Sequence, residues 1–170
     1  MQLTSACGKL LAAIVATQLF GLPLTTTPRA VAVQAWSTML PAVIAATPAV
    51  DAPIVIVPTA TDAVYGLEES TGTIRWRRQL GMAEPAGQHQ AIDCMDVAPS
   101  VGVLSTPAVD RAHHVVYVSA RSWDGHTPGS ATWDLHALDT RTGDELPGWP
   151  VPVAGRADND PNAVFEAVHQ

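Results

Sequence analysis

Hydrophobic residues occur along this chain in short runs separated by Pro, Gly, Thr and Asp. Short apolar runs bounded by turn residues at a spacing of about 8–12 are typical of strands in an all-β protein. After residue 35, no segment of useful length has the period of an amphipathic helix. The pattern therefore predicts an all-β fold, with strands at 39–50, 54–57, 63–67, 74–80, 101–109, 115–120, 132–138 and 145–153.

A repeat organises these runs. The word Thr-Pro-Ala-Val-Asp occurs at 47–51 and again at 106–110, and each copy leads through two apolar runs to a Thr-Gly pair, at 71–72 or 142–143. The words lie 59 positions apart and the Thr-Gly pairs 71, and we assign the difference mainly to an inserted loop at 121–130. One such unit cannot bury its own apolar faces and must stack on a neighbour. We therefore expect two four-stranded antiparallel units side by side.

The N-terminal region differs in character from the rest. Residues 1–50 contain no acidic residue, and an apolar run extends from Leu10 to Leu24. This is the length of a signal-peptide core and is too short to span a bilayer comfortably. We interpret residues 1–35 as a signal peptide or apolar leader, which predicts a secreted or periplasmic protein with no membrane span in the mature chain. Two alternatives are an apolar N-terminal element that packs on the domain and an upstream extension from an artificial start site.

Charge and cysteine content exclude some classes of function. The net charge of −7 argues against binding to nucleic acid, which requires a basic stripe. The densest basic group is Arg75, Arg77 and Arg78, which we interpret as a solvated strand edge. Cys7 lies in the leader, so removal of the leader leaves Cys94 without an intrachain disulfide partner, whereas a chain that keeps the leader allows a Cys7–Cys94 bridge.

The segment 63–76 resembles the pyrroloquinoline-quinone (PQQ) repeat, in which a Trp follows a Thr-Gly turn by four residues. Gly72 and Trp76 keep that spacing. The second copy, 135–143, matches the first half of the motif, but Pro147 stands at the Trp position and Trp149 lies two residues late. The segment 94–110 also looks like the stretch between blades in secreted quinoprotein-like β-propellers. The resemblance covers about residues 47–155.

This resemblance implies a partial β-propeller of about two four-stranded antiparallel blades. Blade one would span about 39–80, blade two about 101–153, and 154–170 would be an incomplete tail within a propeller domain of 36–170. The Trp after Thr-Gly would dock on the adjacent blade. The residues assigned to the structural repeat signature are Thr71, Gly72, Trp76, Thr106, Pro107, Asp110, Leu138, Asp139, Thr142 and Gly143.

The sequence does not contain a complete catalytic site. Quinoprotein dehydrogenases of this family hold PQQ on the propeller axis beside a calcium ion bound by Glu, Asn and Asp, often under a vicinal disulfide. This chain has no Cys-Cys pair, and its Asn159 and Asn162 lie in the tail outside any repeat. We therefore expect no catalytic or metal-binding residue, and PQQ and calcium only if the chain is part of a complete quinoprotein.

Other candidate sites are weaker. His113 and His114 are adjacent on an expected strand, so their rings should face opposite sides and not share a metal. The sequence Asp158-Asn159-Asp160 lacks the Gly and distal Glu of a calcium loop. Asp93 and Asp96 flank Cys94 in a connection expected to be solvated. For Trp123, Trp133 and Trp149, we favour roles in the core and in docking between blades over a shared binding surface.

Three functions follow from this interpretation. The first is a non-catalytic exported propeller fragment that serves as a binding or scaffold module. The second is a fragment of a PQQ-dependent dehydrogenase whose catalytic blades lie elsewhere. The third is a module that completes a ring by self-association or with further blades, and we expect the isolated pair to be marginally stable and prone to associate through open strands.

Overall fold

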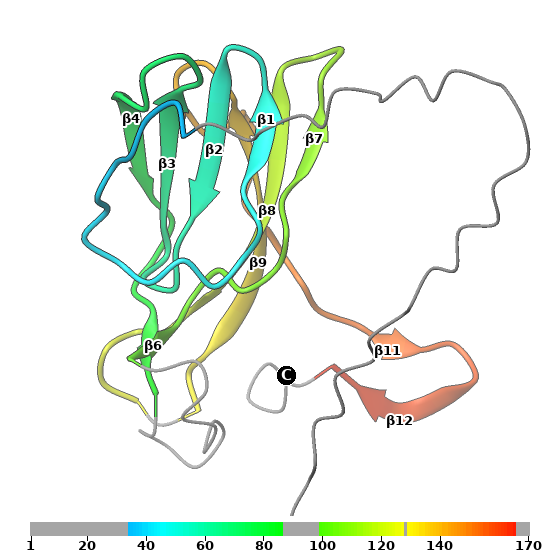
Figure 1. Cartoon of the computed structure of the whole chain (residues 1–170). Coiled ribbons are helices and arrows are strands. Elements are labelled where there is room, and N and C mark those ends of the chain that lie inside the picture. The colour runs from blue at the N-terminus through cyan, green and yellow to red at the C-terminus, as the bar shows by residue number, and fades with distance from the viewer. Residues whose placement is uncertain (1–33, 87–98, 128, 166–170) are drawn as a thin grey trace, which may run out of the picture. The chain divides into compact units, whose positions relative to one another are not determined.

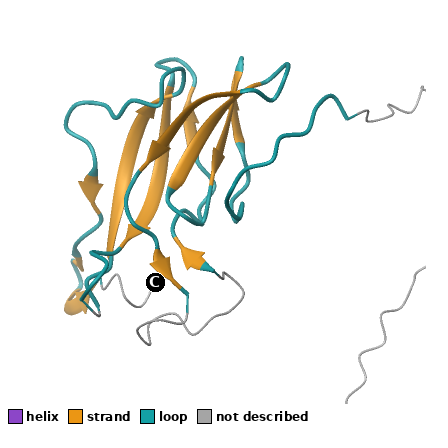
Figure 2. Cartoon of the chain, turned by 90° about the vertical axis from the view of Figure 1, so that its left-hand side faces the viewer, coloured by secondary structure: helices purple, strands orange, loops and turns teal. Residues whose placement is uncertain are grey.

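The computed structural model describes residues 34–86, 99–127 and 129–165. All regular structure in these ranges is β, as Figures 1 and 2 show. The expected leader, apart from residues 34–35, and Cys7, Asp93, Cys94 and Asp96 lie outside the described residues. Within the described ranges, no helix is long and apolar enough to cross a membrane.

Two four-stranded antiparallel sheets form the body of the fold (Figure 1). In both sheets the strands lie in chain order, so each strand pairs with the next through a hairpin or loop. The predicted all-β fold with two four-stranded antiparallel units is confirmed. The first sheet contains β1 (Ala49–Asp51), β2 (Ile54–Pro58), β3 (Ala63–Glu68) and β4 (Ile74–Gln79), and the second contains β7 (Ala108–Asp110), β8 (Val115–Ser122), β9 (Thr132–Asp139) and β10 (Val151–Pro152).

The two sheets share one register. Ile54 pairs with Glu68 in the first sheet, and Val115 pairs with Asp139 in the second. Val115 follows Ile54 by 61 positions and Asp139 follows Glu68 by 71, whereas the repeated words are 59 positions apart. Two of the twelve extra residues therefore fall in the β7–β8 turn, and ten fall between the start of β8 and the end of β9. The inserted loop thus accounts for most of the offset, as predicted.

Three expected strands are much shorter than the apolar pattern suggested. Within the run 39–50, only the last two residues are in a strand, β1. The run 101–109 contributes its first residue to a short two-stranded ribbon and its last two residues to β7, and the run 145–153 contributes only β10. Each run contains proline, which has no N–H to donate to a strand ladder. Val101 pairs instead in a ribbon of β5 (Glu84–Pro85) and β6 (Ser100–Val101), and Glu145 makes a single bridge to Leu138. In the tail, β11 (Arg156–Ala157) and β12 (Asp160–Val164) form a separate hairpin.

The main hydrophobic core lies between the two sheets. Ile56 and Trp76 of the first sheet face Val116, Val118 and other apolar side chains of the second. Ile56 and Val116 are fully buried, and Trp76 is 8% exposed. The sheets are therefore joined face to face by the apolar side chains that alternate along each strand. The complete cluster is Ile54, Ile56, Val64, Trp76, Val103, Val116, Val118, Ala120 and Leu138.

The other face of the first sheet is covered by the segment 36–46. Trp36 and Leu40 pack against a second cluster that includes Tyr65 and Leu67. The main chain is held there by a hydrogen bond from Ala60 N to Val43 O of 2.9 Å. This segment was expected to be a strand, but it lies across the sheet as an extended strap. We call residues 36–46 the strap.

Candidate functional site

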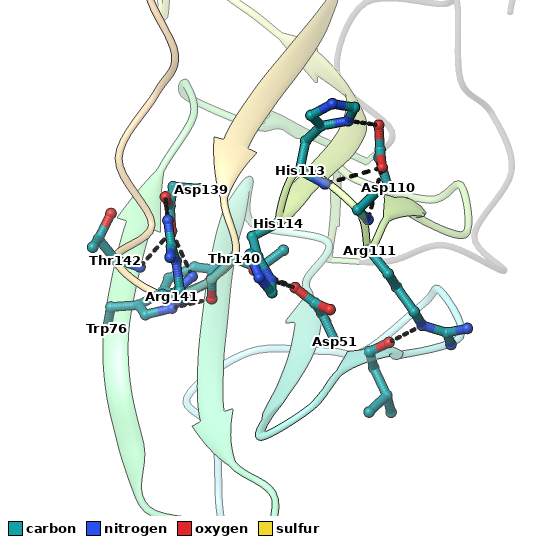
Figure 3. Close-up of polar contacts among 12 residues, drawn as sticks. Asp51, Trp76, Asp110, Arg111, His113, His114, Asp139, Thr140, Arg141 and Thr142 are labelled. Carbon is teal, nitrogen blue, oxygen red and sulfur yellow. Dashed lines mark hydrogen bonds and ion pairs between the residues drawn. The ribbon is translucent and has the colours of Figure 1, made fainter.

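The joint between the sheets centres on Trp76. Its indole Nε1 donates a hydrogen bond of 2.9 Å to the carbonyl oxygen of Thr140, in the turn that follows β9 (Figure 3). The ring lies against Gly143, where a Cβ atom would stand 2.5 Å from Trp76 Cε3. Gly143 also has φ of +76°, a conformation that glycine adopts without strain. The turn therefore requires glycine for two independent reasons.

The same joint occurs a second time, with Trp36 as the donor. Trp36 Nε1 donates to Glu69 O at 2.6 Å, and a Cβ on Gly72 would overlap the Trp36 ring. Glu69 precedes Gly72 by three residues, as Thr140 precedes Gly143, and Gly72 has φ of +71°. The strap thus places a tryptophan on the first sheet just as the first sheet places one on the second.

Sequence reasoning missed Trp36. It stands beside the expected leader, far from any Thr-Gly turn in the same unit. A signal was present, because Leu40 follows Trp36 by four residues as Leu80 follows Trp76. Both leucines pack against the core beside their tryptophan. The spacing Trp-x-x-x-Leu therefore marks the docking element in both places.

Polar side chains reinforce the joint at the end of β1. The Asp51 carboxylate accepts a hydrogen bond of 2.6 Å from Thr140 Oγ1 and lies 2.9 Å from His114 Nδ1 (Figure 3). Arg111 Nε donates to Val50 O at 3.3 Å. Burial raises the pKa of Asp51, but the hydrogen bonds from Thr140 and His114 outweigh it and the pKa is lowered overall. Asp51 is therefore an ionised acceptor that ties the first sheet to the second.

The second copy of the repeated word places Asp110 differently. Asp110 Oδ1 accepts from the backbone N–H groups of Ala112 and His113, and Oδ2 lies 2.7 Å from His113 Nδ1. The hydrogen bond with His113 is the main cause of the lowered pKa of Asp110. Asp110 thus stabilises its own β7–β8 turn, whereas Asp51 reaches the neighbouring sheet.

His113 and His114 lie in that turn and not on a strand, which corrects the prediction. The turn is two residues longer than the β1–β2 turn, and His114 adopts φ of +56°. The two rings contact different carboxylates, Asp110 and Asp51, and so do not converge. In the described ranges, no group of three or more His, Cys, Asp or Glu side chains is arranged to hold a metal ion.

The other signature residues have local roles. In the turn after β9, Asp139 pairs with Arg141 at 2.8 Å and accepts from Thr142 N, and its lowered pKa is caused first by the hydrogen bond from Arg141. Leu138 is fully buried between the sheets. Thr71 is exposed and donates to Thr73 Oγ1. Thr106 is exposed and Pro107 is buried, just before β7.

A buried polar cluster lies at the other end of the sheets. Arg121 is fully buried and forms an ion pair with Glu84, which is 3% exposed. Asp62 is also fully buried, has φ of +60°, and accepts from Ser122 Oγ at 3.4 Å. Desolvation raises the pKa of Asp62 to about 7. Sequence reasoning did not find this cluster, because it assigned Arg121 to the inserted loop, whereas β8 extends to Ser122.

A shallow depression of about 360 Å³ opens beside this cluster. Met82 and Ala83 line it together with polar groups such as Gln79 and Ser100. Gln79 is already bonded to the carbonyls of Thr61 and Gly81. The lining therefore offers few free polar groups for a ligand.

A third polar group crosses the joint near its outer edge. His136 is buried, and its Nδ1 lies 2.9 Å from Glu145 Oε1. Arg78 of the first sheet approaches Glu145 at 3.8 Å. Arg77, by contrast, lies over the Tyr65 ring on the opposite face of the first sheet. The basic group is thus divided between two faces, and Arg78 contributes to the joint rather than to a solvated edge.

Trp123, Trp133 and Trp149 do not form one surface. Trp123 Nε1 donates to Thr127 O within the inserted loop, and Trp133 lies on β9 opposite Arg121. The Trp149 ring packs on Tyr117, with centroids 5.5 Å apart. Asp158 to Asp160 lie in the exposed tail hairpin, where Asp160 accepts from Asn162 N.

Comparisons with known proteins add the following. No protein-family model and no curated protein matches the chain. Among solved structures, BamB from Moraxella catarrhalis is similar over 63% of this chain and 23% of its own, with 23% identity and a TM-score of 0.36. A europium-containing methanol dehydrogenase is similar over 65% of this chain and 15% of its own, with 15% identity and a TM-score of 0.44. The chain spans less than a quarter of either protein.

The two predicted repeats are established by the chain's own sheets and by the repeated tryptophan contact. Both sheets have the order, register and Trp-on-turn contact expected of adjacent repeats in a PQQ-type propeller. The resemblance predicted from the sequence thus agrees with the fold.

Proposed function

We propose that this chain is a non-catalytic part of an exported β-propeller protein and that it serves as a scaffold or binding module. The observation that carries the proposal is the use of its polar side chains. Asp51, His114 and Thr140 are engaged with one another across the joint, and the Trp76 indole is bonded to the same turn. These groups are used to hold the two sheets together, which favours a structural role for them.

The residues do not fit the PQQ and calcium that the family resemblance implies. A calcium site requires several carboxylate and amide oxygens around one point. In the described part of the chain, the acidic side chains are distributed over separate turns and no such cluster forms. Export is supported by the apolar run at 10–24, which precedes the described residues.

Reconstitution tests the proposal against the alternative of a dehydrogenase fragment. Purified full chain is mixed with PQQ and calcium, and quinone absorbance and dye-linked alcohol oxidation are measured. We expect neither a cofactor-dependent change in the spectrum nor oxidation above the level of free PQQ. Saturable PQQ binding with alcohol-dependent dye reduction would overturn the non-catalytic role. Secretion of a reporter fused after residue 35, compared with one lacking residues 1–35, tests export.

A further inference from the structure

Two segments of the passage between the sheets pack on the turn that joins β2 to β3. These are residues 80–86 and 99–103, which we call the link segments. The first bonds to the turn through Leu80 N, which donates to Asp62 O at 2.9 Å. The second bonds to it through Val103 N, which donates to another carbonyl oxygen of the turn at 3.3 Å. Both link segments are therefore tied to one turn.

The Asp62 side chain lies at the centre of this contact and is fully buried. Its Oδ2 accepts a long hydrogen bond of 3.4 Å from Ser122 Oγ, and its Oδ1 has no hydrogen-bond partner in the described part of the chain. The link segments approach the carboxyl group closely because they carry glycine there. A Cβ on Gly102 would stand 2.5 Å from Oδ1, and a Cβ on Gly81 would stand 3.8 Å from Oδ2. The carboxyl group is thus enclosed with one weak hydrogen bond.

The charged residues near Asp62 do not supply it with a counter-ion. Arg121 precedes Ser122 on β8, so its side chain leaves the strand on the opposite face, where it pairs with Glu84. Glu84 is the one charged residue of the link segments, and it is acidic. Desolvation raises the pKa of Asp62 to about 7, and the hydrogen bond from Ser122 and the attraction of Arg121 offset this only in part.

The enclosure suits the neutral form of the carboxyl group. A buried carboxylate without a counter-charge is costly, whereas a protonated carboxyl group is neutral and can itself donate to Ser122 Oγ. The positive φ of Asp62, +60°, fixes the backbone at this point of the turn. Because both link segments lie against the side chain, the cost of ionisation falls on their contact with the turn.

We propose that Asp62 is a pH-sensitive switch: the neutral side chain holds the link segments on the β2–β3 turn, and ionisation releases them while both sheets stay folded. The strand ladders β2–β3 and β8–β9 are formed by backbone pairing that does not involve this carboxyl group. The shallow depression is lined by Gly81 and Ser100 of the link segments, so release changes its shape. This inference is independent of the proposed scaffold role.

The pH range of the switch follows from two pKa values. The pKa of Asp62 is about 7 when the link segments enclose it, and a released, hydrated side chain has the ordinary value of 3.8. Closure is therefore strongest below pH 3.8 and is lost as the pH rises through about 7. Between these values the opening constant rises about tenfold per pH unit, so we expect an increase of about 10–100-fold from pH 5 to pH 7.

Hydrogen–deuterium exchange of the full chain at single-residue resolution tests the switch. Exchange is measured at pH 5, 6, 7 and 8 and corrected for the intrinsic pH dependence of amide exchange. The amides of Leu80 and Val103 report on the link segments, because both donate to the turn. The amides of the β8–β9 ladder serve as the reference. We expect protection of Leu80 and Val103 to fall by about 10–100-fold from pH 5 to pH 7, with little change in the reference.

Two matched variants assign the effect to one carboxyl group. Asp62→Asn cannot ionise and suits the positive φ, which Asn adopts more readily than most residues, so it should keep the link segments protected at pH 8. Asp158→Asn removes a carboxyl group from the exposed tail and should leave the pH dependence unchanged. Constant protection of Leu80 and Val103 in the wild-type series, the same loss in D62N, or an equal loss throughout the β8–β9 ladder would overturn the proposal. The wild-type series decides the question even if D62N does not fold.

Discussion

Replacing Trp76 tests whether the joint, and not each sheet alone, determines stability. Truncation of a large buried aromatic to alanine costs about 3–5 kcal/mol, because contacts are lost and a cavity remains. Trp76→Ala also removes the 2.9 Å hydrogen bond to Thr140 O, worth about 0.5–1.5 kcal/mol. Since small domains are stable by only about 5–15 kcal/mol, we expect W76A to lose most of its cooperative unfolding transition.

Two further substitutions separate the contributions. Trp76→Phe keeps an aromatic ring in the core but lacks the indole N–H, so it should cost about 1–2 kcal/mol. Trp149→Ala removes a partly exposed ring that packs on Tyr117 and should cost less than half as much as W76A. Urea unfolding followed by near-ultraviolet circular dichroism measures all three. A cost of W149A equal to that of W76A would refute the view that the joint stabilises the pair.

Three other predictions concern single positions. Gly143→Ala should be more destabilising than Gly148→Ala in thermal melts, because both have positive φ but only at Gly143 does the new Cβ meet Trp76. The raised pKa of Asp62 means that its protonated form favours folding, so the contribution of Asp62 to stability should be fully present below pH 3.8 and should be lost as the pH rises to about 7. Asp62→Asn should flatten this dependence, measured as urea midpoints at pH 5 and pH 8. Glu84→Gln should cost about 3–5 kcal/mol in chemical denaturation, because it removes the buried negative charge that Glu84 presents to Arg121; a cost below 1 kcal/mol would contradict this.

Local chemistry explains which parts of the fold were predictable. The Thr-Gly turns were found because glycine is needed at positive φ, and Gly72 and Gly143 both adopt it. Strand limits were missed where proline interrupts an apolar run, since hydrophobicity does not show whether a backbone N–H is present.

Long-range contacts explain what the sequence did not reveal. Asp62 bonds Ser122, and Asp51 bonds Thr140, 89 positions away. Neither pair has a local signature, because each depends on two sheets meeting at a fixed register. The turn that contains His113 and His114 was missed for a similar reason. It is two residues longer than the β1–β2 turn, and this difference becomes visible only once the strand pairing is known.

The strap covers the face of the first sheet that points away from the second sheet. In stacked-repeat proteins a terminal element commonly shields the last apolar face from water. Here the strap shields one face of the first sheet with Trp36 and Leu40, while Trp149 of the second sheet packs on Tyr117 of its own sheet. A further sheet could therefore reach this face of the first sheet only by displacing the strap.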